Sequence, residues 1–447
     1  MNTKALRQKI LDLAIHGKLV PQDPNDEPAS VLLERIKAEK ERLIKEGKIK
    51  RTKRSKAACD KPHYPYELPK GWCWCKLEEI VKITNGRSQK NVEDKEGLYP
   101  IYGSGGIIGK ATEFLCEAGT TIIGRKGTIN NPIFVKERFW NIDTAFGMKP
   151  QYAISDKYFF FFCQHFNFSE LDKSTAVPSL TQSAINDIFI PIPPTNEQKR
   201  IVKEIIRCFS VVEILEKEKI DLQLTIEQTK SKILDLAIHG KLVPQDPTDE
   251  PASELLKRIN PKAEITCDNP QYGNLPKGWC ICRLKDMAKV ITGSTPSKSN
   301  KEYYGGNFPF YKPADLDLGR HVNKASEYLT QAGKNVSRLV PSGTTAVCCI
   351  GSIGKVGFLE YEGTTNQQIN CVIPSECLDN VYLYYSCSSQ WFYSSLIAES
   401  SAVTISIVNK SKMENVVMPL PPLQEQHRIV AKIEELFTQL DKIEASL

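Results

Sequence analysis

The stretch that decides the fold is KILDLAIHGKLVPQDP, residues Lys9–Pro24, because the same sixteen residues return without a change at Lys232–Pro247. Over the longer segment Lys9–Ile36, only positions 25, 31 and 34 differ from their partners. Chance does not produce a match of this length. Internal repeats indicate an architecture built more than once from one unit. We therefore expect a chain that contains its frame twice.

Two further blocks repeat around segments that do not. The blocks are LPKGWCWCKL (Leu68–Leu77) with LPKGWCICRL (Leu275–Leu284), and PIPPTNEQKRIVKEI (Pro191–Ile205) with PLPPLQEQHRIVAKI (Pro419–Ile433). The segments between them, Gly86–Asn186 and Gly293–Asn415, agree only in scattered glycines. We call these dissimilar segments the first and the second insert. One duplicated frame thus holds two different inserts.

Length and composition place the chain among ordinary globular proteins. Its 447 residues allow about three domains at roughly 150 residues each. Hydrophobic residues make up 41% and charged residues 25%, which excludes fibrous and wholly disordered chains. No apolar run approaches the roughly 20 residues of a membrane span, and the first residues lack an apolar signal core. With fourteen cysteines interpreted as reduced thiols, we expect a cytoplasmic protein without membrane contact.

Charge is informative in its distribution more than in its sum. The formal net charge of +6 is compatible with a polyanionic partner but does not require one. The run Lys37–Lys56 carries ten Lys or Arg residues against three Glu. This run is interpreted as a solvated helix end or linker, with contact to phosphates as the alternative. Any nucleic-acid surface on the inserts must therefore be one-sided or depend on specific groove contacts.

Each copy of the third repeated block is expected to begin a long helix. Its proline run ends the preceding strand, and apolar residues then recur with a spacing of 3.5 residues. Nine of eleven positions from Ile201 in steps of four and three are apolar. A helix over 196–238 would be roughly 65 Å long. The alternative is two amphipathic helices on separate domains. The predicted coiled-coil seam is Ile201, Ile205, Val212, Leu215, Leu222, Ile226, Ile429, Ile433, Leu436, Leu440, Ile443 and Leu447.

The repeat offsets predict a circularly permuted pair of units. By the 228-residue offset of the third block, Leu447 corresponds to Lys219, and by the 223-residue offset of the first block, Met1 corresponds to Leu224. Only four residues are missing between these positions. The second copy of the long helix thus stops almost where the N-terminal segment would continue it. We expect 1–17 to pack against the C-terminal helix or to stack on its end. A free, frayed N-terminus is the alternative.

The inserts show no catalytic signature. Strands are predicted at Trp72–Leu77 and Trp279–Leu284, where β-forming residues follow a turn. Zinc binding by Cys73 and Cys75 is the alternative, but no second cysteine pair with ligand spacing follows. The glycine-rich stretch 101–111 lacks the spacing of a phosphate loop, and the six histidines form no metal-ligand motif. We expect His16 and His239 to be packing or capping residues, and no metal, cofactor or catalytic residue on this chain.

Two glycine-bearing turns, Gly124–Asn131 and Gly351–Gly357, carry basic and amide side chains between apolar strands. Arginine can pair with guanine, Asn and Gln with adenine, and Lys with phosphate. The candidate DNA-binding residues are Arg87, Ser88, Tyr102, Ser104, Arg125, Lys126, Asn130 and Asn141 in the first insert, and Ser294, Lys298, Tyr311, Lys312, Ser352, Lys355, Asn366, Gln367 and Gln368 in the second.

Taken together, the duplicated ILDLAIHGKLVPQDP and LPKGW blocks, the two P-x-P-P-x-x-E-Q-x-R-I-V helix starts and the dissimilar inserts resemble the specificity subunits of type I restriction-modification systems. The resemblance implies two target-recognition domains that each read half of a split, asymmetric site in double-stranded DNA. It also implies two adenine methyltransferase subunits that bring S-adenosylmethionine, and restriction subunits that use ATP and Mg²⁺. The short C-terminal helix departs from the family pattern unless the N-terminus completes it.

We therefore expect an α+β protein with two mixed α/β target-recognition domains joined by two long antiparallel coiled-coil helices. It would be a non-catalytic specificity subunit. The alternative is a coiled-coil assembly scaffold, or an orphan defence adaptor, whose inserts bind protein. The expected parts are an N-terminal helical segment (1–36) that completes the second conserved region, a basic linker (37–63), the first recognition domain (64–195), a central helix (196–240), a linker (241–271), the second recognition domain (272–423) and a C-terminal helix (424–447).

Overall fold

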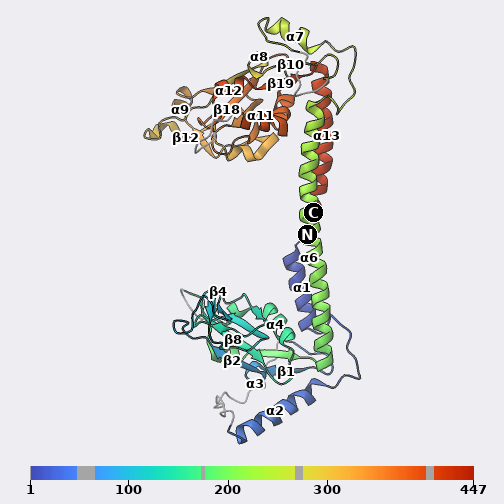
Figure 1. Ribbon diagram of the computed structural model, residues 1–447, viewed down its shortest axis with the longest axis vertical. Helices are drawn as coiled ribbons and strands as arrows, with labels where there is room; N and C mark the ends of the chain where they lie inside the picture. The colour runs from blue at the N-terminus through green and yellow to red at the C-terminus, as the bar shows by residue number, and fades with distance from the viewer. Residues whose placement is uncertain (1, 48–65, 173–176, 267–274, 399–406) are drawn as a thin grey trace. The chain divides into compact units, whose positions relative to one another are not determined.

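The chain folds into two compact units, 1–218 and 219–447, each with one insert (Figure 1). The structure is a computed structural model that describes residues 2–47, 66–172, 177–266, 275–398 and 407–447. Helix α6 (Thr195–Ile238) is a single helix that supplies the end of the first unit and the start of the second. No Gly or Pro interrupts its 44 residues. Among the described residues, no helix is both long and apolar enough to cross a membrane.

The first unit places a mixed α/β domain beside its helices. Its elements are α1 (Thr3–Ile15), α2 (Ala29–Lys45), β1 (Cys73–Lys76), α3 (Leu77–Ile80), β2 (Val81–Asn85), β3 (Tyr99–Gly103), β4 (Gly106–Ala111), β5 (Thr120–Gly124), β6 (Ile133–Val135), β7 (Trp140–Asn141), β8 (Ala145–Pro150), α4 (Asp156–His165), η1 (Phe168–Leu171), α5 (Gln182–Asn186) and β9 (Phe189–Ile192).

The second unit repeats this arrangement with extra short elements in its insert. Its elements are α7 (Ala252–Ile259), β10 (Cys280–Arg283), α8 (Leu284–Met287), β11 (Ala288–Thr292), η2 (Lys301–Tyr303), β12 (Tyr304–Tyr311), η3 (Asp315–His321), β13 (Glu327–Leu329), α9 (Gln331–Asn335), β14 (Leu339–Val340), β15 (Thr344–Cys348), β16 (Val356–Leu359), β17 (Gly363–Thr365), β18 (Ile369–Pro374), α10 (Asn380–Cys387), α11 (Gln390–Ala398), α12 (Lys410–Glu414), β19 (Val417–Leu420) and α13 (Leu423–Ala445).

The two inserts share one topology although their sequences hardly agree. The larger sheet has the order β2-β8-β5-β6 in the first unit and β11-β18-β15-β16 in the second. Each smaller sheet contains one parallel pair, β3 with β7 and β12 with β17. Two of the scattered glycines explain part of the likeness. A Cβ on Gly86 would lie 1.8 Å from the carbonyl oxygen of Ile142, and one on Gly293 would lie 2.2 Å from that of Asn366. Both positions need a residue without a side chain.

Entry and exit strands close each insert at its base. Strand β1 pairs with β9 in the first unit, and β10 pairs with β19 in the second, both antiparallel. The predicted strands at Trp72–Leu77 and Trp279–Leu284 are confirmed as β1 and β10. Because the first and last strands of an insert are hydrogen-bonded to each other, the loops between them can vary without moving the ends. The twelve cysteines that the structure describes are free thiols.

Each unit also contains an antiparallel helix pair. In the first unit, Ile10, Leu11 and Ala14 of α1 share a core with Ile201 and Ile205 of α6. Figure 1 shows α1 beside this part of α6. A 2.7 Å ion pair between an α1 arginine and an α6 glutamate, Arg7 and Glu216, closes the far end of the pair. The burial of apolar side chains along one stripe of α6 holds α1 in place.

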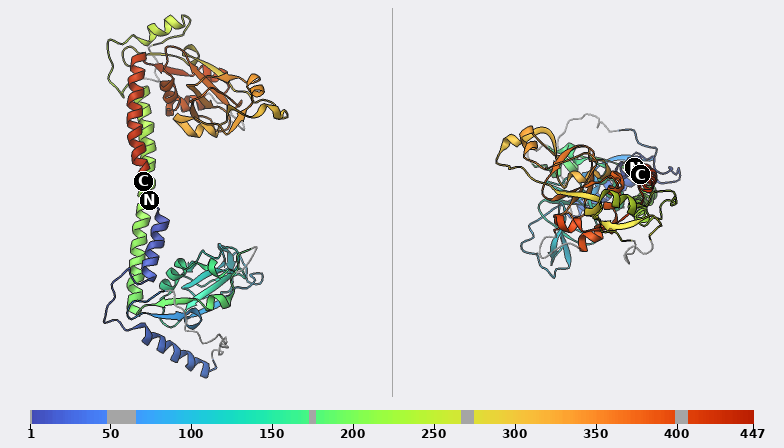
Figure 2. Two further views of the ribbon diagram at one scale, coloured as in Figure 1. Left: turned by 180° about the vertical axis from the view of Figure 1, so that it is seen from behind. Right: turned by 90° about the horizontal axis from the view of Figure 1, so that it is seen from above.

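The second unit builds the same pair from α13 and the other part of α6. Ile233 and Leu234 of α6 share a core with Ile429 and Ile433 of α13. Lys230 forms ion pairs of 2.6 Å with Asp441 and 3.5 Å with Glu444. The left view of Figure 2 shows α13 beside this part of α6.

The predicted seam is only partly covered within the units. Ile201, Ile205, Val212, Ile226, Ile429 and Ile433 are buried, Leu215, Leu436, Leu440 and Leu447 are half-buried, and Leu222 and Ile443 are exposed. The coiled-coil interpretation therefore stays a prediction. So does the expected contact between 1–17 and the C-terminal helix, which would join the two units. Within its own unit, α1 packs on α6.

Two segments expected as linkers contain helices. Helix α2 runs through Lys45 into the expected linker 37–63, and α7 lies within the expected linker 241–271. The reason is local sequence. After the repeat ends, Pro261 follows closely on α7, whereas α2 meets no breaker before Gly47, which has φ +73°. The rest of the basic run, residues 48–56, lies outside the described residues, as do 57–63 and 267–271.

Candidate nucleic-acid interface

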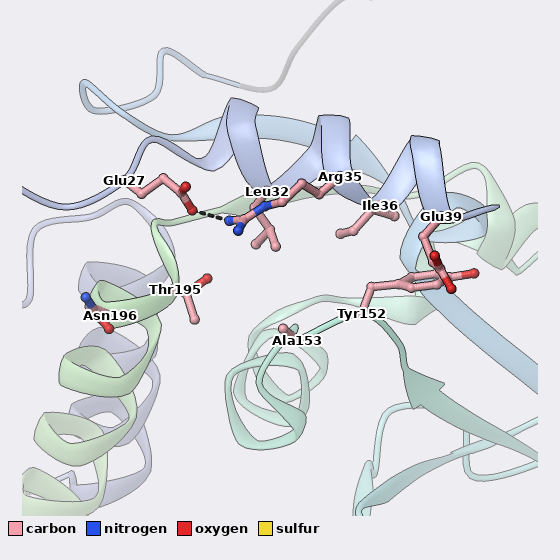
Figure 3. Close-up of a pocket in the computed structure, with 9 residues that line it drawn as sticks. All are labelled: Glu27, Leu32, Arg35, Ile36, Glu39, Tyr152, Ala153, Thr195 and Asn196. Atoms are coloured by element: carbon pink, nitrogen blue, oxygen red, sulfur yellow. Dashed lines mark hydrogen bonds and ion pairs between the residues drawn. The ribbon is translucent and has the colours of Figure 1, made fainter. Parts of the chain in front are cut away.

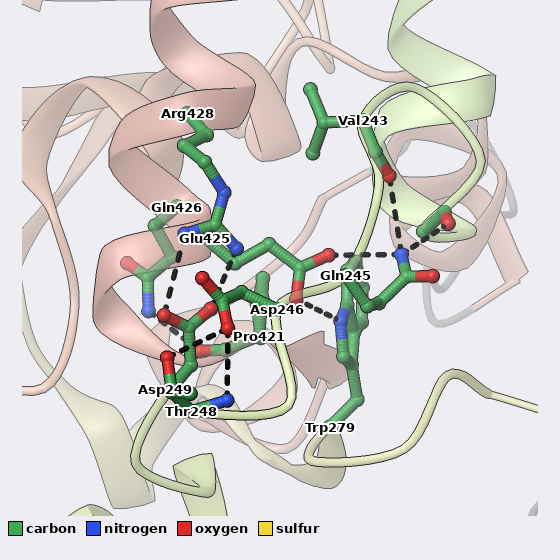
Figure 4. Close-up of polar contacts among 11 residues, drawn as sticks. Val243, Gln245, Asp246, Thr248, Asp249, Trp279, Pro421, Glu425, Gln426 and Arg428 are labelled. Carbon is green, nitrogen blue, oxygen red and sulfur yellow. Dashed lines mark hydrogen bonds and ion pairs between the residues drawn. The ribbon is translucent and has the colours of Figure 1, made fainter.

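A buried polar joint fixes each insert to the start of its long helix. In the second unit, the carboxylate of Glu425 accepts hydrogen bonds from Nε1 of Trp279 at 2.9 Å and from Nε2 of Gln245 at 3.1 Å (Figure 4). Trp279 belongs to the repeated LPKGW block and Gln245 to the repeated VPQDP block. The three repeated blocks therefore meet at one buried carboxylate, which is 1% exposed. Burial raises the pKa of Glu425, because the charged form loses its water.

The residues next to Glu425 extend the joint into the insert. Oε1 of Gln426 accepts a 2.7 Å hydrogen bond from the backbone N–H of Asp379, the N-cap residue of α10. Its Nε2 donates to the carbonyls of Pro421 and Cys377 at 2.9 and 3.0 Å. A fully satisfied buried amide of this kind fixes the geometry of the elements that it joins. The orientation of the second insert relative to the start of α13 is set here.

An ion pair completes the joint on the solvent side. Arg428 of α13 contacts Asp249 at 2.6 Å, and the Asp249 side chain is only 7% exposed. The first unit has the same pair, Arg200 with Asp26, also at 2.6 Å and with the Asp26 side chain 6% exposed. Burial raises the pKa of Glu197, the counterpart of Glu425, in the same direction. The ion pair, the buried glutamate and its glutamine donor are thus built twice. The tryptophan differs, because Nε1 of Trp279 donates to Glu425 whereas Nε1 of Trp72 is buried without a hydrogen-bond partner among the described residues.

The far edge of the first insert gathers strand ends that are distant in sequence. The end of β2 meets the start of β8, where Asn85 pairs with Phe146, and the end of β5 meets the same region, where Gly124 pairs with Ala145. The backbone N–H of Arg125 donates to Thr144 at 2.7 Å. Loops that leave these ends therefore lie side by side.

Six predicted candidates lie at this edge, which we call the first edge. The backbone N–H of Arg87 donates to the carbonyl of Asn141 at 2.9 Å. The Cβ of Ser104 lies 3.2 Å from the place that a Cβ on Gly124 would take, directly before Arg125. Arg87, Ser88, Arg125 and Lys126 are exposed, and Tyr102 and Ser104 are half-buried. Burial, with Glu137 nearby, raises the pKa of the Tyr102 hydroxyl.

Two candidates of the first insert have other surroundings. Asn141 is fully buried, and its Nδ2 donates to the carbonyl of Ala145 at 3.0 Å. Asn130 is exposed but its Nδ2 donates to Asn167 and Ser169 at 2.9 and 2.6 Å, on the side of η1. Asn141 thus stabilises the backbone beneath the first edge, and Asn130 stabilises the loop at η1. No pattern in the sequence separates these two residues from exposed amides.

The second insert forms a corresponding edge, the second edge. Strand β11 ends where Thr292 pairs with Asn370, and β15 ends where Cys348 pairs with Ile369. The hydroxyl of Thr295 hydrogen-bonds to the side chain of Gln367, which joins two loops across this edge. Lys298, Ser352 and Gln367 are exposed, and Ser294, Lys312, Lys355, Asn366 and Gln368 are half-buried.

Several candidates at the second edge already have partners within the protein. Lys312 pairs with Glu327 at 2.9 Å and Lys355 with Asp317 at 2.6 Å. Nδ2 of Asn366 donates to the Gln368 side chain at 2.8 Å. Tyr311 is fully buried, and burial raises the pKa of its hydroxyl to about 12. Tyr311 is therefore part of the core beneath this edge.

Sequence reasoning missed Arg338. Its exposed side chain donates from Nη1 to the carbonyl of Thr292 at 3.0 Å, and its backbone N–H donates to Oγ of Ser294 at 3.2 Å. Arg338 reaches this edge because β14, which follows it, pairs with β17. Because this contact depends on the pairing of β14 with β17, no local motif around position 338 predicts it.

The first unit also contains a cavity of about 520 Å³ at the opposite end of the insert, beside α2 (Figure 3). Its lining residues are Glu27, Leu32, Arg35, Ile36, Glu39, Tyr152, Ala153, Thr195 and Asn196. Tyr152 and Ala153 have φ of +57° and +65°, a backbone conformation unfavourable for residues with a side chain. Arg35 pairs with Glu27 across the opening. The cavity depends on the length of α2, because Glu39 lies beyond the position at which α7 ends in the second unit.

Asp12, His16 and His165 come close enough to hold a metal ion, with one Asp12 carboxylate oxygen 3.2 Å from His16 and 3.6 Å from His165. However, Nδ1 of His16 lies 2.7 Å from the carbonyl oxygen of Asp12, and His239 makes the same contact with Asp235. A nitrogen that donates to a carbonyl has no lone pair for a metal. The geometry supports the predicted capping role of both histidines.

Comparison with known proteins agrees with the duplicated design. The family model described as "Type I restriction modification DNA specificity domain" matches residues 69–224 and 276–447. The EcoAI specificity subunit of Escherichia coli is 26% identical over 98% of this chain and 90% of its own length, and the EcoEI subunit of Escherichia coli is 25% identical over 99% and 90%. The crystal structure of the HsdS subunit from Thermoanaerobacter tengcongensis has the same fold, with a TM-score of 0.52 at 18% identity over 86% of this chain and 93% of that one. The chain therefore belongs to the family of type I restriction-modification specificity subunits.

Proposed function

We propose that the two inserts each read one half of a bipartite, asymmetric DNA site, at the first edge and the second edge. The observation that carries this proposal is that one topology presents two different sets of side chains at matching strand ends. A single reading geometry with unlike side chains is what recognition of two unlike half-sites requires. It also removes the need for a two-fold symmetric protein on a two-fold symmetric site.

The chemistry of the two edges supports different base preferences. The first edge exposes Arg87 and Arg125, whose guanidinium groups suit bidentate pairing with guanine. The second edge exposes Gln367, whose amide suits adenine, with Lys298 and Arg338 able to contact phosphates or guanine. Each well-placed bidentate pair discriminates against a wrong base by about 1–3 kcal/mol.

In this proposal α6 sets the gap between the half-sites. Its 44 residues correspond to about 66 Å at 1.5 Å per residue. The insertion of seven residues into each helix of a pair would keep an apolar seam in phase and add about 10 Å, or about three base pairs. We expect the preferred spacer to lengthen by that amount. An unchanged spacer would refute the role of the helices as a ruler.

The repeated frame is proposed to bind two methyltransferase subunits in the cytoplasm, where host DNA lies. The exposed apolar side chains of Val211 and Ile214 on α6 support a protein-binding role for the helices. The partner subunits would bring S-adenosylmethionine and flip the target adenine. Restriction subunits with ATP and Mg²⁺ would join the same assembly.

Sequencing of methylated adenines in host DNA tests the proposal directly. We expect one motif with two unlike specific halves and a gap of fixed length, which is lost when the gene for this chain is deleted. A continuous motif, or no change on deletion, would contradict it. Binding of the purified assembly to that motif should also weaken steeply with added salt, whereas an assembly scaffold that binds protein through apolar contacts would show little salt dependence.

A further inference from the structure

The hairpin formed by β3 and β4 in the first insert presents two exposed branched apolar residues. Ile107 is 63% exposed and Ile108 is 52% exposed. The pairing of the two strands shifts at this point, since Tyr102 faces Ile107 whereas Ile101 faces Gly109. Ile108 is therefore the additional residue of a β-bulge. Bulges re-aim side chains that would otherwise alternate between the two faces of a strand.

This hairpin belongs to the first edge. Its turn contains Ser104, whose Cβ lies 3.2 Å from the Cβ position of Gly124, so the hairpin lies against the loop that carries Arg125 and Lys126. Lys110 follows on β4 and is exposed. Among the residues that the structure describes, no acidic side chain forms an ion pair with Arg125, Lys126 or Lys110. Lys110 is thus a cation close to the two isoleucines that is available for phosphates, and Arg125 and Lys126 follow Gly124 on the loop that the hairpin contacts. The Glu93 carboxylate lies near Gly109 of the same strand.

The corresponding strand of the second insert lacks this feature. Strand β13 pairs antiparallel with β12 as β4 pairs with β3. Leu329 of β13 is fully buried, and its neighbours Glu327 and Tyr328 are half-buried. Exposed isoleucines are therefore not required by the shared topology. The described residues of β13 carry no exposed isoleucine, unlike β4 of the first edge.

We propose that Ile107 and Ile108 form an apolar wedge that enters between two base pairs of the half-site read by the first insert and unstacks them. The proposal rests on the proposed function and adds a DNA deformation to it. Apolar side chains that enter a base step unstack it and kink the duplex, while neighbouring cations hold the backbone. DNA is favoured over a protein partner because protein interfaces are depleted in lysine, and the exposed Lys110 lies two residues from Ile108 on the same strand.

The wedge would make the two half-sites mechanically unlike. A step that is already unstacked lowers the free energy required to flip a neighbouring base. The half-site of the first insert would be deformed by this chain, and specificity would extend to flexible pyrimidine–purine steps that no side chain contacts. The half-site of the second insert would be read without this deformation.

The test uses the full chain with its methyltransferase subunits and a duplex that carries the methylated host motif, with 2-aminopurine placed in turn at each position of both halves. We expect fluorescence to rise on binding at one step of the first half. Ile107→Ser with Ile108→Ser should abolish that rise and weaken binding about tenfold, or about 1.4 kcal/mol. The slope of affinity against salt should not change, because the wedge contacts no phosphate.

Two matched variants define the outcome. Leu98→Ser, at an 83% exposed leucine that precedes β3, should leave fluorescence and affinity unchanged. Ile107→Val with Ile108→Val should retain most of the rise. If the serine variant unstacks and binds like the wild type, the wedge is refuted while the proposed function stands. Loss of methyltransferase binding by the serine variant without DNA would identify a protein interface and also refute the wedge. If the wild type does not bind the duplex, the proposed function fails as well.

Discussion

The two units of this protein have matching residues at positions where side chains contact each other within a unit. They have different residues at positions that face solvent. Gln22 contacts Glu197 as Gln245 contacts Glu425. The same correspondence holds at the helix pairs, where Arg7 lies over the ring of Phe209 and Lys230 lies over that of Phe437. The first edge and the second edge share strand ends but hardly any side chains. Residues that contact each other can be substituted only together, whereas loop residues at an edge can be substituted singly. The frame is therefore repeated in sequence, and the residues of the two edges are not.

The exchange of one insert should have the largest effect on DNA recognition among the changes that test this comparison of the two units. Replacement of 293–415 by the matching segment of a relative should change the second half-site and leave the first intact. The side chains around Glu425 lie outside the exchanged segment, and Gln426 contacts that segment through backbone groups of Cys377 and Asp379. Affinity for the original site should fall about 10³-fold or more, since specific binding exceeds non-specific binding by at least that factor. Methylated-adenine sequencing measures the new motif. A change in both halves would show that the inserts do not read independently.

Trp279→Ala should destabilise the second unit by about 3–5 kcal/mol, because a 4% exposed side chain is removed from the core and Glu425 loses a donor. Trp72→Ala, at a 6% exposed side chain, should have a similar effect on the first unit. Hydrogen exchange followed by mass spectrometry can assign the loss of protection to one unit. An effect below about 1 kcal/mol in either unit would mean that the joint is not what holds the insert.

Arg428→Ala should cost about 1–3 kcal/mol, because it leaves the nearly buried carboxylate of Asp249 without its partner. Arg200→Ala should match it in the first unit. Arg258→Ala is the control, because Arg258 and Glu250 are exposed at 64% and 43% and exposed ion pairs contribute little to stability. Chemical denaturation of the three variants gives the comparison. Equal losses for Arg428 and Arg258 would argue against a special role for the joint.

The smallest expected effect concerns pH. Burial raises the pKa of Glu197 and Glu425 above the ordinary value of 4.5, so the folded state binds protons more tightly than the unfolded state. Their contribution to stability is fully present below pH 4.5 and is lost as pH rises through the raised pKa. Glu425→Gln should flatten this part of the stability profile, which chemical denaturation across the pH range measures. A steeper dependence of stability on pH in the variant would show that the pKa of Glu425 is not raised in the folded state.

The sequence predicted the parts that repeat. The starts of α6 and α13 and the strands β1 and β10 follow from blocks whose two copies confirm each other. Sequence could not predict that the inserts share a topology, because the signal is reduced to glycines such as Gly86 and Gly293, each of which marks a close approach of two backbones. Such glycines are visible in a sequence, but their contacts are not.

The candidate edges were predicted less well for a related reason. Gly124 and Ser104 are twenty residues apart and meet only because β3 and β5 end at one side of the insert, which brings Arg125 to the same edge. Asn141 and Tyr311 are of residue types that contact bases, yet both are buried. Side-chain chemistry can be read from a sequence, whereas exposure at a strand end depends on which strands pair. The contribution of Arg338 depends on the same long-range pairing.

The uninterrupted backbone of α6 restricts how such a protein can evolve. One inserted residue advances a helix by 1.5 Å and also turns everything beyond it by about 100° around the axis. Small insertions therefore alter the facing of whatever follows much more than its distance, and only additions close to whole turns preserve both. If α6 separates two half-sites, their separations among relatives should fall into a few discrete classes, and intermediate lengths should be absent.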